Sequence, residues 1–312
     1  MDIVLLFPGQ GSQKPGMGRD LADAFPEARA VFGEVDAALG QPLSLLMFEG
    51  PAEELTLTHN AQPALLAHGA AVWALARERL SPYVRAAAGH SLGEFTAYHA
   101  AGALSLSDAV RLVRRRGELM YESGVRQPGA MAALLGEPSR PIEEICTQAT
   151  SEAGLAVPAN YNCPGQLVIS GEVDGVERAM QLAKESGVKR AIRLNVSGAF
   201  HSPLMESAAD GLAEALKRHA LATPQFPVYS NVSAEPVTDA ARGGALLLEQ
   251  LTSPVRWTEE VRAITARYPD ALLVEMGPGS VLTGLVKKIA PAARTQTCGT
   301  AAEVEQLLEL VA

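Results

Sequence analysis

A Gly-x-Ser-x-Gly pentapeptide at residues 89–93 constrains this chain more than any other part of its sequence. The run before it, residues 84–88, can enter a buried strand, and residues 94–103 after it are rich in alanine and free of proline, which favours a helix. Strand, sharp turn and helix are the setting in which this pattern lifts a serine hydroxyl clear of the backbone. We therefore predict a nucleophile elbow centred on Ser91, at a helix N-terminus that favours a developing oxyanion.

The pentapeptide alone is a weak signal, because a chance match with a structural serine has the same letters. A serine hydroxyl is also a weak nucleophile and needs a base. Of the six histidines, His90 adjoins Ser91, but neighbours across a tight turn face apart. His201 follows a predicted strand and precedes a predicted helix, in the kind of loop that forms α/β active sites. No acid stands out as a third member, but a backbone carbonyl can also orient the imidazole, so a dyad suffices.

Length and composition describe a globular protein of 312 residues, long enough for two structural units, with 47% hydrophobic and 20% charged residues. The first residues lack a basic segment and their apolar run is short, so we expect a first strand there and no signal peptide. No apolar run approaches membrane-spanning length, and a net charge of −9 argues against general nucleic-acid binding. Three widely spaced cysteines suggest reduced thiols in a cytoplasmic protein, without metal-binding spacing.

Alternation of apolar runs and helical patterns predicts an α/β fold, beginning with a buried parallel strand over residues 2–7. In the helix expected over 61–80, Pro63 falls in the first turn, where proline is tolerated. Outside residues 126–195, we expect helices over roughly 17–38, 43–49, 61–80, 107–122, 203–219, 244–251, 257–268 and 280–289, and further strands over 226–231 and 271–276.

Residues 126–195 have a different pattern, with strands and helices in the order βαββαβ. This order is that of a split-βαβ, ferredoxin-like unit. The predicted strands are 129–136, 155–160, 166–170 and 188–195, and the predicted helices are 140–152 and 173–186. We therefore expect a small domain over 126–195, inserted into a large domain made of residues 1–125 and 196–312.

Arg116 lies on the apolar stripe of the helix expected over 107–122, between Val113 and Met120. An arginine on such a stripe needs an anion, because an unpaired buried charge is too costly. A structural ion pair, or a side chain that extends to solvent, would satisfy the pattern as well. The functional interpretation is a receptor for a carboxylate.

Several segments together resemble the motifs of the malonyl-CoA:acyl carrier protein transacylase family. They occur in the order of the family and span nearly the whole chain. They are Phe-Pro-Gly-Gln-Gly-Ser-Gln at 7–13, Gly-His-Ser-Leu-Gly-Glu at 89–94, Arg-Gly at 116–117, Asn-Tyr-Asn-Cys-Pro-Gly-Gln at 160–166, Gly-Ala-Phe-His-Ser-Pro-Leu-Met at 198–205 and Gly-Pro-Gly at 277–279. The resemblance implies an α/β-hydrolase-like large domain with a parallel sheet and an inserted ferredoxin-like small domain.

The resemblance also implies a role for each matching residue. Ser91 would carry the acyl group, and His201 would be its base. Arg116 would bind the free malonyl carboxylate. The remaining residues implied are Gln10 and Leu92 for the oxyanion hole through their backbone N–H groups, Gln250 for orienting the histidine through its main-chain carbonyl, and Met120, Phe200, Asn160 and Asn162 for binding the substrate.

The implied reaction is ping-pong transfer of malonyl from malonyl-CoA to the phosphopantetheine thiol of an acyl carrier protein, as in fatty acid biosynthesis. The CoA thioester is a substrate, and no metal or other cofactor is implied. Phe200, directly before the histidine, favours malonyl over methylmalonyl in related acyltransferases. The resemblance further favours a monomer, and the composition favours a cytoplasmic protein that binds neither nucleic acid nor membrane.

Four alternatives remain open from the sequence. Two share the chemistry, namely a stand-alone acyltransferase of a polyketide synthase and the transacylase subunit of malonate decarboxylase. A serine hydrolase would pass the acyl group to water, although Arg116 is unsuited to a plain esterase pocket. A binding scaffold without activity would not need Ser91 and His201.

An acidic carrier protein is not attracted by a chain that is itself acidic overall, so we expect a local basic docking surface. The candidates are Lys189, Arg190 and Arg193 in the small domain, and Lys287 and Lys288 in the helix over 280–289. Ordinary solvated charges would look the same in the sequence.

Overall fold

Strand β1 (Ile3–Phe7) is apolar along its whole length because helices cover both faces of its sheet. In the computed structural model, which describes residues 1–311, β1 pairs in parallel with β2 (Val84–Gly89) and β9 (Leu272–Met276). Its odd-numbered residues pack into the larger core beside α5 (Thr58–Leu80), and its even-numbered residues into a second core beside α12 (Trp257–Arg267). The expected buried parallel strand is therefore confirmed.

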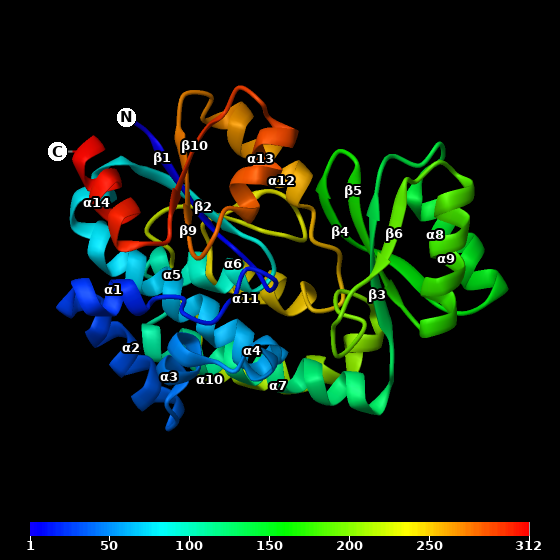
Figure 1. Ribbon diagram of the computed structural model, residues 1–312, viewed down its shortest axis with the longest axis horizontal. Helices are drawn as coiled ribbons and strands as arrows, with labels where there is room; N and C mark the ends of the chain where they lie inside the picture. Colours follow the sequence, from blue (N-terminus) through cyan, green and yellow to red (C-terminus); the bar gives the residue numbers. More distant parts are fainter. Residues whose placement is uncertain (312) are drawn as a thin grey trace.

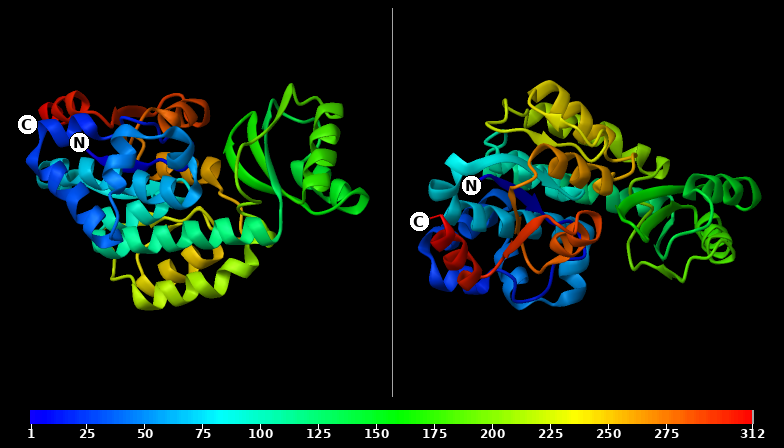
Figure 2. Two further views of the ribbon diagram at one scale, coloured as in Figure 1. Left: turned by 60° about the horizontal axis from the view of Figure 1, so that its bottom comes forward. Right: turned by 90° about the horizontal axis from the view of Figure 1, so that it is seen from above.

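The large α/β body has the strand order β10-β9-β1-β2-β7-β8, parallel except for the last pair (Figure 1). Helices of the larger core cover one face of this sheet and α12 and α13 the other, as the two views in Figure 2 show. The remaining strands are β7 (Val228–Tyr229), β8 (Pro236–Val237) and β10 (Arg294–Cys298). The other helices of the body are α1 (Arg19–Ala24), α2 (Pro26–Leu39), α3 (Leu43–Glu49), α4 (Ala52–Thr56), α6 (Leu92–Ala100), α7 (Leu106–Arg126), α10 (Ala209–Arg218), α11 (Ala240–Glu249), α13 (Val281–Ile289) and α14 (Ala301–Leu310), with short 3-10 turns at Ser81–Tyr83 and Pro203–Ala208.

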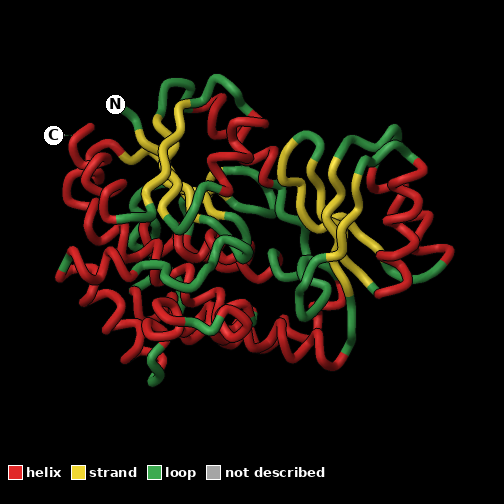
Figure 3. Tube along the Cα trace, in the orientation of Figure 1, coloured by secondary structure: helices red, strands yellow, loops and turns green. Residues whose placement is uncertain are grey.

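A smaller antiparallel sheet lies at the end of the molecule away from both termini (Figures 1 and 3). Its order is β4-β5-β3-β6, and two helices cover its outer face. These elements are β3 (Ala130–Leu135), α8 (Ile142–Glu152), β4 (Ala156–Cys163), β5 (Gln166–Gly171), α9 (Val173–Glu185) and β6 (Arg190–Arg193). The order and pairing are those of a ferredoxin-like unit, as expected, while the exact domain boundaries stay a prediction.

The small sheet is hydrogen-bonded to the large body through β4. Tyr161 N donates to Val255 O at 2.9 Å, and Val255 N donates to Ala159 O at 2.8 Å. The sequence pattern ends this strand at Asn160, but the strand continues to Cys163 because Tyr161 and Cys163 also pair with β5. The large body thus meets the small sheet along a strand edge close to the nucleophile elbow.

Helix α5 begins at Thr58, earlier than expected, so Pro63 lies inside the helix and not in its first turn. A proline there leaves the carbonyl of His59 without its helical partner. Arg114 of α7 supplies one, since its Nη1 donates to His59 O at 2.9 Å. The two helices come close enough because Gly117 has no side chain, and a Cβ there would lie 2.6 Å from His59 Cα. This tertiary contact makes the early start of α5 possible.

The end of the chain differs most from the sequence expectation, which placed the last helix over 280–289. Strand β10 and helix α14 follow α13, with β10 paired to β9 at the edge of the sheet. The strand was missed because its polar, half-buried residues do not form an apolar run. A signal for the helix was present, because Thr300 and Glu303 form a capping box at its start.

Smaller differences have local causes. The helix expected over 17–38 is broken before Pro26 into α1 and α2. The helix expected over 203–219 starts as a 3-10 turn, and the strand expected over 226–231 is only β7. Helix α11 starts and ends a little before the expected 244–251. Within residues 1–311, no helix is both long and apolar enough to cross a membrane.

We predict that Gly93→Ala destabilises the fold, because a Cβ at this position would lie 2.1 Å from the carbonyl oxygen of Phe7. Overpacking of this kind costs about 1–3 kcal/mol or more. Gly244→Ala is the matched control, because it lies in α11 with no atom within 4 Å of an added Cβ. It should raise stability by about 0.5–1 kcal/mol. Urea denaturation measures both, and an unchanged midpoint for Gly93→Ala would contradict the close approach.

Candidate active site

Ser91 occupies the sharp turn between β2 and α6, with φ 52° and ψ −110°. A non-glycine residue at such angles stores about 1–3 kcal/mol of strain, which surrounding contacts must hold. The turn is tight because a Cβ on Gly89 would lie 2.0 Å from the Gly93 carbonyl. Ser91 therefore presents its hydroxyl at the carboxyl end of a parallel strand, in the geometry of the predicted elbow.

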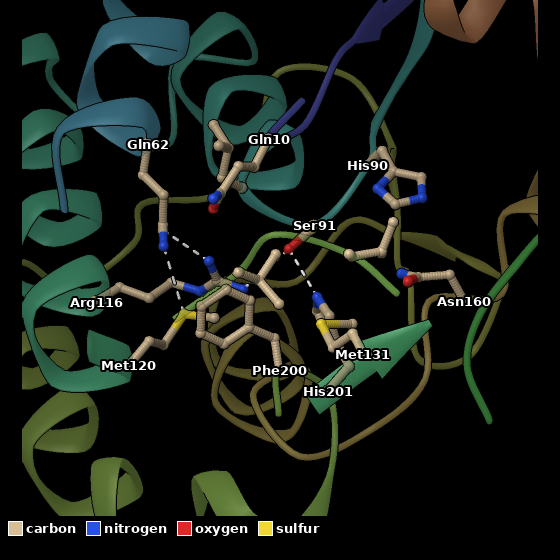
Figure 4. Close-up of a pocket in the computed structure, with 13 residues that line it drawn as sticks. Gln10, Gln62, His90, Ser91, Arg116, Met120, Met131, Asn160, Phe200 and His201 are labelled. Atoms are coloured by element: carbon tan, nitrogen blue, oxygen red, sulfur yellow. Dashed lines mark hydrogen bonds between the residues drawn. The ribbon is translucent and has the colours of Figure 1, made fainter. Parts of the chain in front are cut away.

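His201 lies opposite Ser91, with its Nε2 2.8 Å from Ser91 Oγ (Figure 4). On the other side of the ring, Nδ1 faces the carbonyl oxygens of Gln250 at 3.0 Å and Ser253 at 3.2 Å. Carbonyls only accept, so Nδ1 carries the proton and Nε2 is free to accept one from the serine. The structure thus brings the predicted pair together and places the Gln250 carbonyl where the sequence resemblance implies.

Burial is the main cause that lowers the pKa of His201 to about 3, and the charge of Arg116 adds to it. The lowered pKa keeps the imidazole neutral at ordinary pH. The His201 imidazole is therefore in the form that can accept a proton.

Arg116 is buried, and its guanidinium reaches the nucleophile. Its Nη1 donates to Gln62 Oε1 at 2.7 Å, and its Nη2 donates to Gln250 Oε1 at 2.9 Å and to Ser91 Oγ at 3.2 Å. The guanidinium also lies 5.4 Å from the ring centroid of Phe95. Burial lowers the pKa of Arg116 to about 10, so the side chain stays charged near neutral pH.

A pocket opens over these groups (Figure 4). It is lined by Gln10, Gln62, His90, Ser91, Leu92, Arg116, Met120, Met131, Asn160, Leu194, Val196, Phe200 and His201. Five of these were not among the predicted site residues: Gln62, His90, Met131, Leu194 and Val196. The sequence predicts that His90 faces away from Ser91, yet His90 lines the same pocket. The others come from α5, β3 and the segment after β6, which only the folded chain brings to the elbow.

The predicted oxyanion residues both line this pocket. Leu92 is the first residue of α6, so its N–H has no acceptor within the helix. Gln10 follows β1, and its side-chain Oε1 accepts from Thr58 Oγ1 at 2.9 Å, which orients the loop. Their role as an oxyanion hole stays a prediction.

Asn160 and Asn162, both predicted to bind substrate, differ in where the structure places them. Asn160 lines the pocket, whereas Asn162 is not one of its lining residues. Instead, the Oδ1 of Asn162 lies 2.8 Å from Nε2 of His90. The extension of β4 to Cys163 places Asn162 within the strand, where it links the small sheet to the elbow.

The described part of the chain contains no group of three or more His, Cys, Asp and Glu residues that could hold a metal ion. The three cysteines are buried free thiols. The polar groups that line the pocket include the Ser91 hydroxyl, the His201 imidazole and the Arg116 guanidinium. This set suits acyl transfer to serine from an ester or thioester that carries a negative charge.

Comparison with models of protein families matches residues 4–305 to the acyl transferase domain. The fold and the site thus define an acyltransferase.

Closer relatives are malonyl transferases. The malonyl CoA-acyl carrier protein transacylase of Bacillus subtilis is 50% identical over 288 residues, covering 92% of this chain and 90% of that protein. The crystal structure of an acyl-carrier-protein-S-malonyltransferase from Bartonella henselae matches with TM-score 0.95 and 45% identity, covering 100% and 99% of the two chains. A malonyl-transacylase solved in complex with its type II PKS acyl-carrier protein matches with TM-score 0.94 and 41% identity, covering 99% and 100%. The chain belongs to the malonyl CoA-acyl carrier protein transacylase family.

We predict that Ser91 keeps its reactivity as the pH falls, because the lowered pKa of His201 leaves the base neutral well below pH 6.5. The rate of modification of Ser91 by phenylmethylsulfonyl fluoride should be nearly flat between pH 8 and about pH 5. Circular dichroism at each pH checks that the protein stays folded. A loss of rate with a midpoint near 6.5 would show that His201 titrates like an exposed histidine.

Proposed function

We propose that this chain transfers malonyl from malonyl-CoA to the phosphopantetheine thiol of an acyl carrier protein, through a malonyl ester on Ser91 and with His201 as the base. The observation that carries the proposal is the position of a buried positive charge beside the nucleophile, with Arg116 Nη2 3.2 Å from Ser91 Oγ. A hydrolase of plain esters has no use for that charge. The family of the chain agrees with this conclusion.

In the first half-reaction, Ser91 Oγ attacks the thioester carbonyl while its proton passes to His201 Nε2. The carbonyl oxygen becomes an oxyanion, for which the N–H groups of Leu92 and Gln10 are the proposed donors. Collapse of the tetrahedral intermediate breaks the carbon–sulfur bond, and the proton on His201 goes to the departing CoA thiolate. The products are the malonyl ester of Ser91 and free CoA.

The second half-reaction reverses these roles with a different thiol. The carrier's pantetheine thiol gives its proton to His201 and attacks the ester carbonyl of malonyl-Ser91. Ser91 leaves and regains the proton from His201, which restores the free enzyme. No step consumes a cofactor, and the two halves together form a ping-pong cycle.

Arg116 selects the acyl group by its charge. A malonyl carboxylate can bind the guanidinium as a bidentate pair, in place of the neutral amide oxygens of Gln62 and Gln250 that hold it now. The Arg116 charge also lowers the pKa of His201. A bound carboxylate offsets that charge, so the correct acyl group makes the base stronger as well as binding more tightly.

The carrier protein approaches from the side where the two sheets meet. Met131 and Leu194 line the pocket from the small unit, so they can contact the pantetheine arm. All five expected docking residues are exposed: Lys189, Arg190 and Arg193 at or just before β6, and Lys287 and Lys288 on α13. Arg193 pairs with Glu177, so its charge is already partnered. Because one matching structure holds a type II PKS carrier protein, a polyketide carrier is a second candidate partner. The cytoplasmic location and the monomeric state stay predictions.

Intact-mass spectrometry after mixing with malonyl-CoA tests the proposal. We expect a malonyl adduct on Ser91 that holo carrier protein discharges much faster than water does. Ser91→Ala should form no adduct, and His201→Ala should form it about a thousandfold more slowly, because the hydroxyl loses its base. An adduct that water discharges as fast as the carrier does would indicate a hydrolase. Near-normal acylation of His201→Ala would remove His201 as the base.

Arg116→Ala should lower kcat/KM for malonyl-CoA far more than for acetyl-CoA, which has no carboxylate for the guanidinium. Loss of one partner from a buried charge pair costs about 2–5 kcal/mol, or roughly thirtyfold or more. Arg115→Ala is the matched control, since that neighbour on α7 pairs with Glu118 and Glu122 at the surface. Equal fractional losses for the two thioesters would show that Arg116 has only a structural role.

A further inference from the structure

Behind the nucleophile, on the side away from the pocket, Asn231 contacts the backbone of the elbow. It lies in the turn that follows β7, the strand next to β2 in the sheet. Its side-chain Oδ1 accepts a hydrogen bond from Ser91 N at 2.7 Å. Asn231 is fully buried and does not line the pocket. It therefore acts on Ser91 only through the main chain.

The orientation of the Asn231 amide is determined by backbone groups. Its Nδ2 donates to the carbonyl of Gly89 at 2.8 Å, and a carbonyl can only accept. Its Oδ1 faces the N–H of Ser91, which can only donate. A flipped amide would lose both bonds. Asn231 thus bridges the last residue of β2 and the nucleophile across the turn.

Asn231 is itself held on every polar atom. Its main-chain N donates to Glu94 Oε2 at 3.1 Å, and its carbonyl accepts from Arg256 N at 2.9 Å. Its Nδ2 also donates to Glu260 Oε1 at 2.8 Å. Two buried carboxylates, from α6 and α12, therefore fix this asparagine in place.

Gln250 holds the other polar group of the nucleophile's backbone. Its Nε2 lies 3.1 Å from Ser91 O, and the same nitrogen donates to Glu94 Oε2 at 2.6 Å. Both main-chain polar groups of Ser91, its N–H and its C=O, therefore bind side-chain amides from outside the elbow. This is the support that a residue at φ 52° requires.

We propose that Asn231 is a positioning residue, which holds the strained Ser91 backbone so that Oγ meets His201 and the Leu92 N–H faces the reacting carbonyl. This inference rests on Ser91 as the nucleophile of the proposed function. Without the Oδ1 contact, Ser91 N–H loses this hydrogen bond and the turn can relax. The hydroxyl then spends less time within reach of Nε2 of His201, and acylation slows while substrate binding stays the same.

The test uses two reagents that react with Ser91 Oγ, one that acylates it and one that sulfonylates it, and both need a positioned hydroxyl with its base. Malonyl-CoA engages Arg116, whereas phenylmethylsulfonyl fluoride has no carboxylate. For Asn231→Ala, we expect both single-turnover rates to fall by about tenfold to a hundredfold and by the same factor. The half-saturating malonyl-CoA concentration should not change. Ser230→Ala is the matched control, because this buried neighbour in the same loop bonds Val232 N and not Ser91, and it should react at the native rate.

Asn231→Leu provides a second variant of nearly the same size, in case the cavity left by alanine unfolds the protein. It fills the space but has neither an acceptor for Ser91 N–H nor a donor for Gly89 O, so the bridge cannot form. We expect the same loss of both rates at unchanged half-saturation. Urea denaturation gives the folded fraction, and a merely structural role predicts native rates for each folded molecule.

Three results would overturn the inference. The first is a folded Asn231 variant that reacts with both reagents at the native rates. The others are a change only in the half-saturating malonyl-CoA concentration, and a loss of both rates in Ser230→Ala as large as in the Asn231 variants. Failure of the proposed function gives a different result, because the unsubstituted protein would then form no malonyl adduct at all. The rates of reaction with phenylmethylsulfonyl fluoride would still show whether Asn231 positions Ser91.

Discussion

A guanidinium charge held inside the protein is the constraint on which the site and much of the large body depend. Arg116 is only 1% exposed, and an unpartnered charge at that depth would cost several kcal/mol. Its present partners are the amide oxygens of Gln62 and Gln250 and the face of Phe95. For Gln62 to reach it, α5 and α7 must approach closely, which they do at Gly117. The packing of this helix pair is thus tied to the position of one charge.

From that charge, a continuous set of polar contacts leads to the reacting atoms. Gln250 accepts from Arg116 with its side-chain oxygen, donates to the Ser91 carbonyl with its nitrogen, and accepts from His201 with its main-chain oxygen. A single residue after α11 therefore touches the proposed anion receptor, the proposed nucleophile and the proposed base. Glu94 accepts a hydrogen bond from the side chain of Gln250. Burial raises the pKa of the Glu94 carboxyl to about 7, while the Arg116 charge opposes the shift.

Much of the site could be predicted from the sequence because the elbow is a local structure. Ser91 and its flanking glycines are adjacent in the chain, and the steric reason for them acts within a few residues. Arg116 could be found because a charge on an apolar helical stripe is itself anomalous. Asn231 could not be found in this way, since an asparagine after a short strand is ordinary in a sequence. Its contact with Ser91 is made across 140 residues, by pairing of β2 with β7.

The sequence by itself determined the α/β class, the ferredoxin-like insertion and the sharp turn at Ser91, because apolar periodicity and the steric demands of a turn depend on neighbouring residues. Tertiary structure alone decided which polar groups meet. It let α5 start before Pro63 by bringing Arg114 to the free carbonyl of His59. It also turned Asn162 toward His90 instead of the pocket. Hydrogen bonds between distant segments depend on distances of a few tenths of an ångström, and only the packed chain sets these.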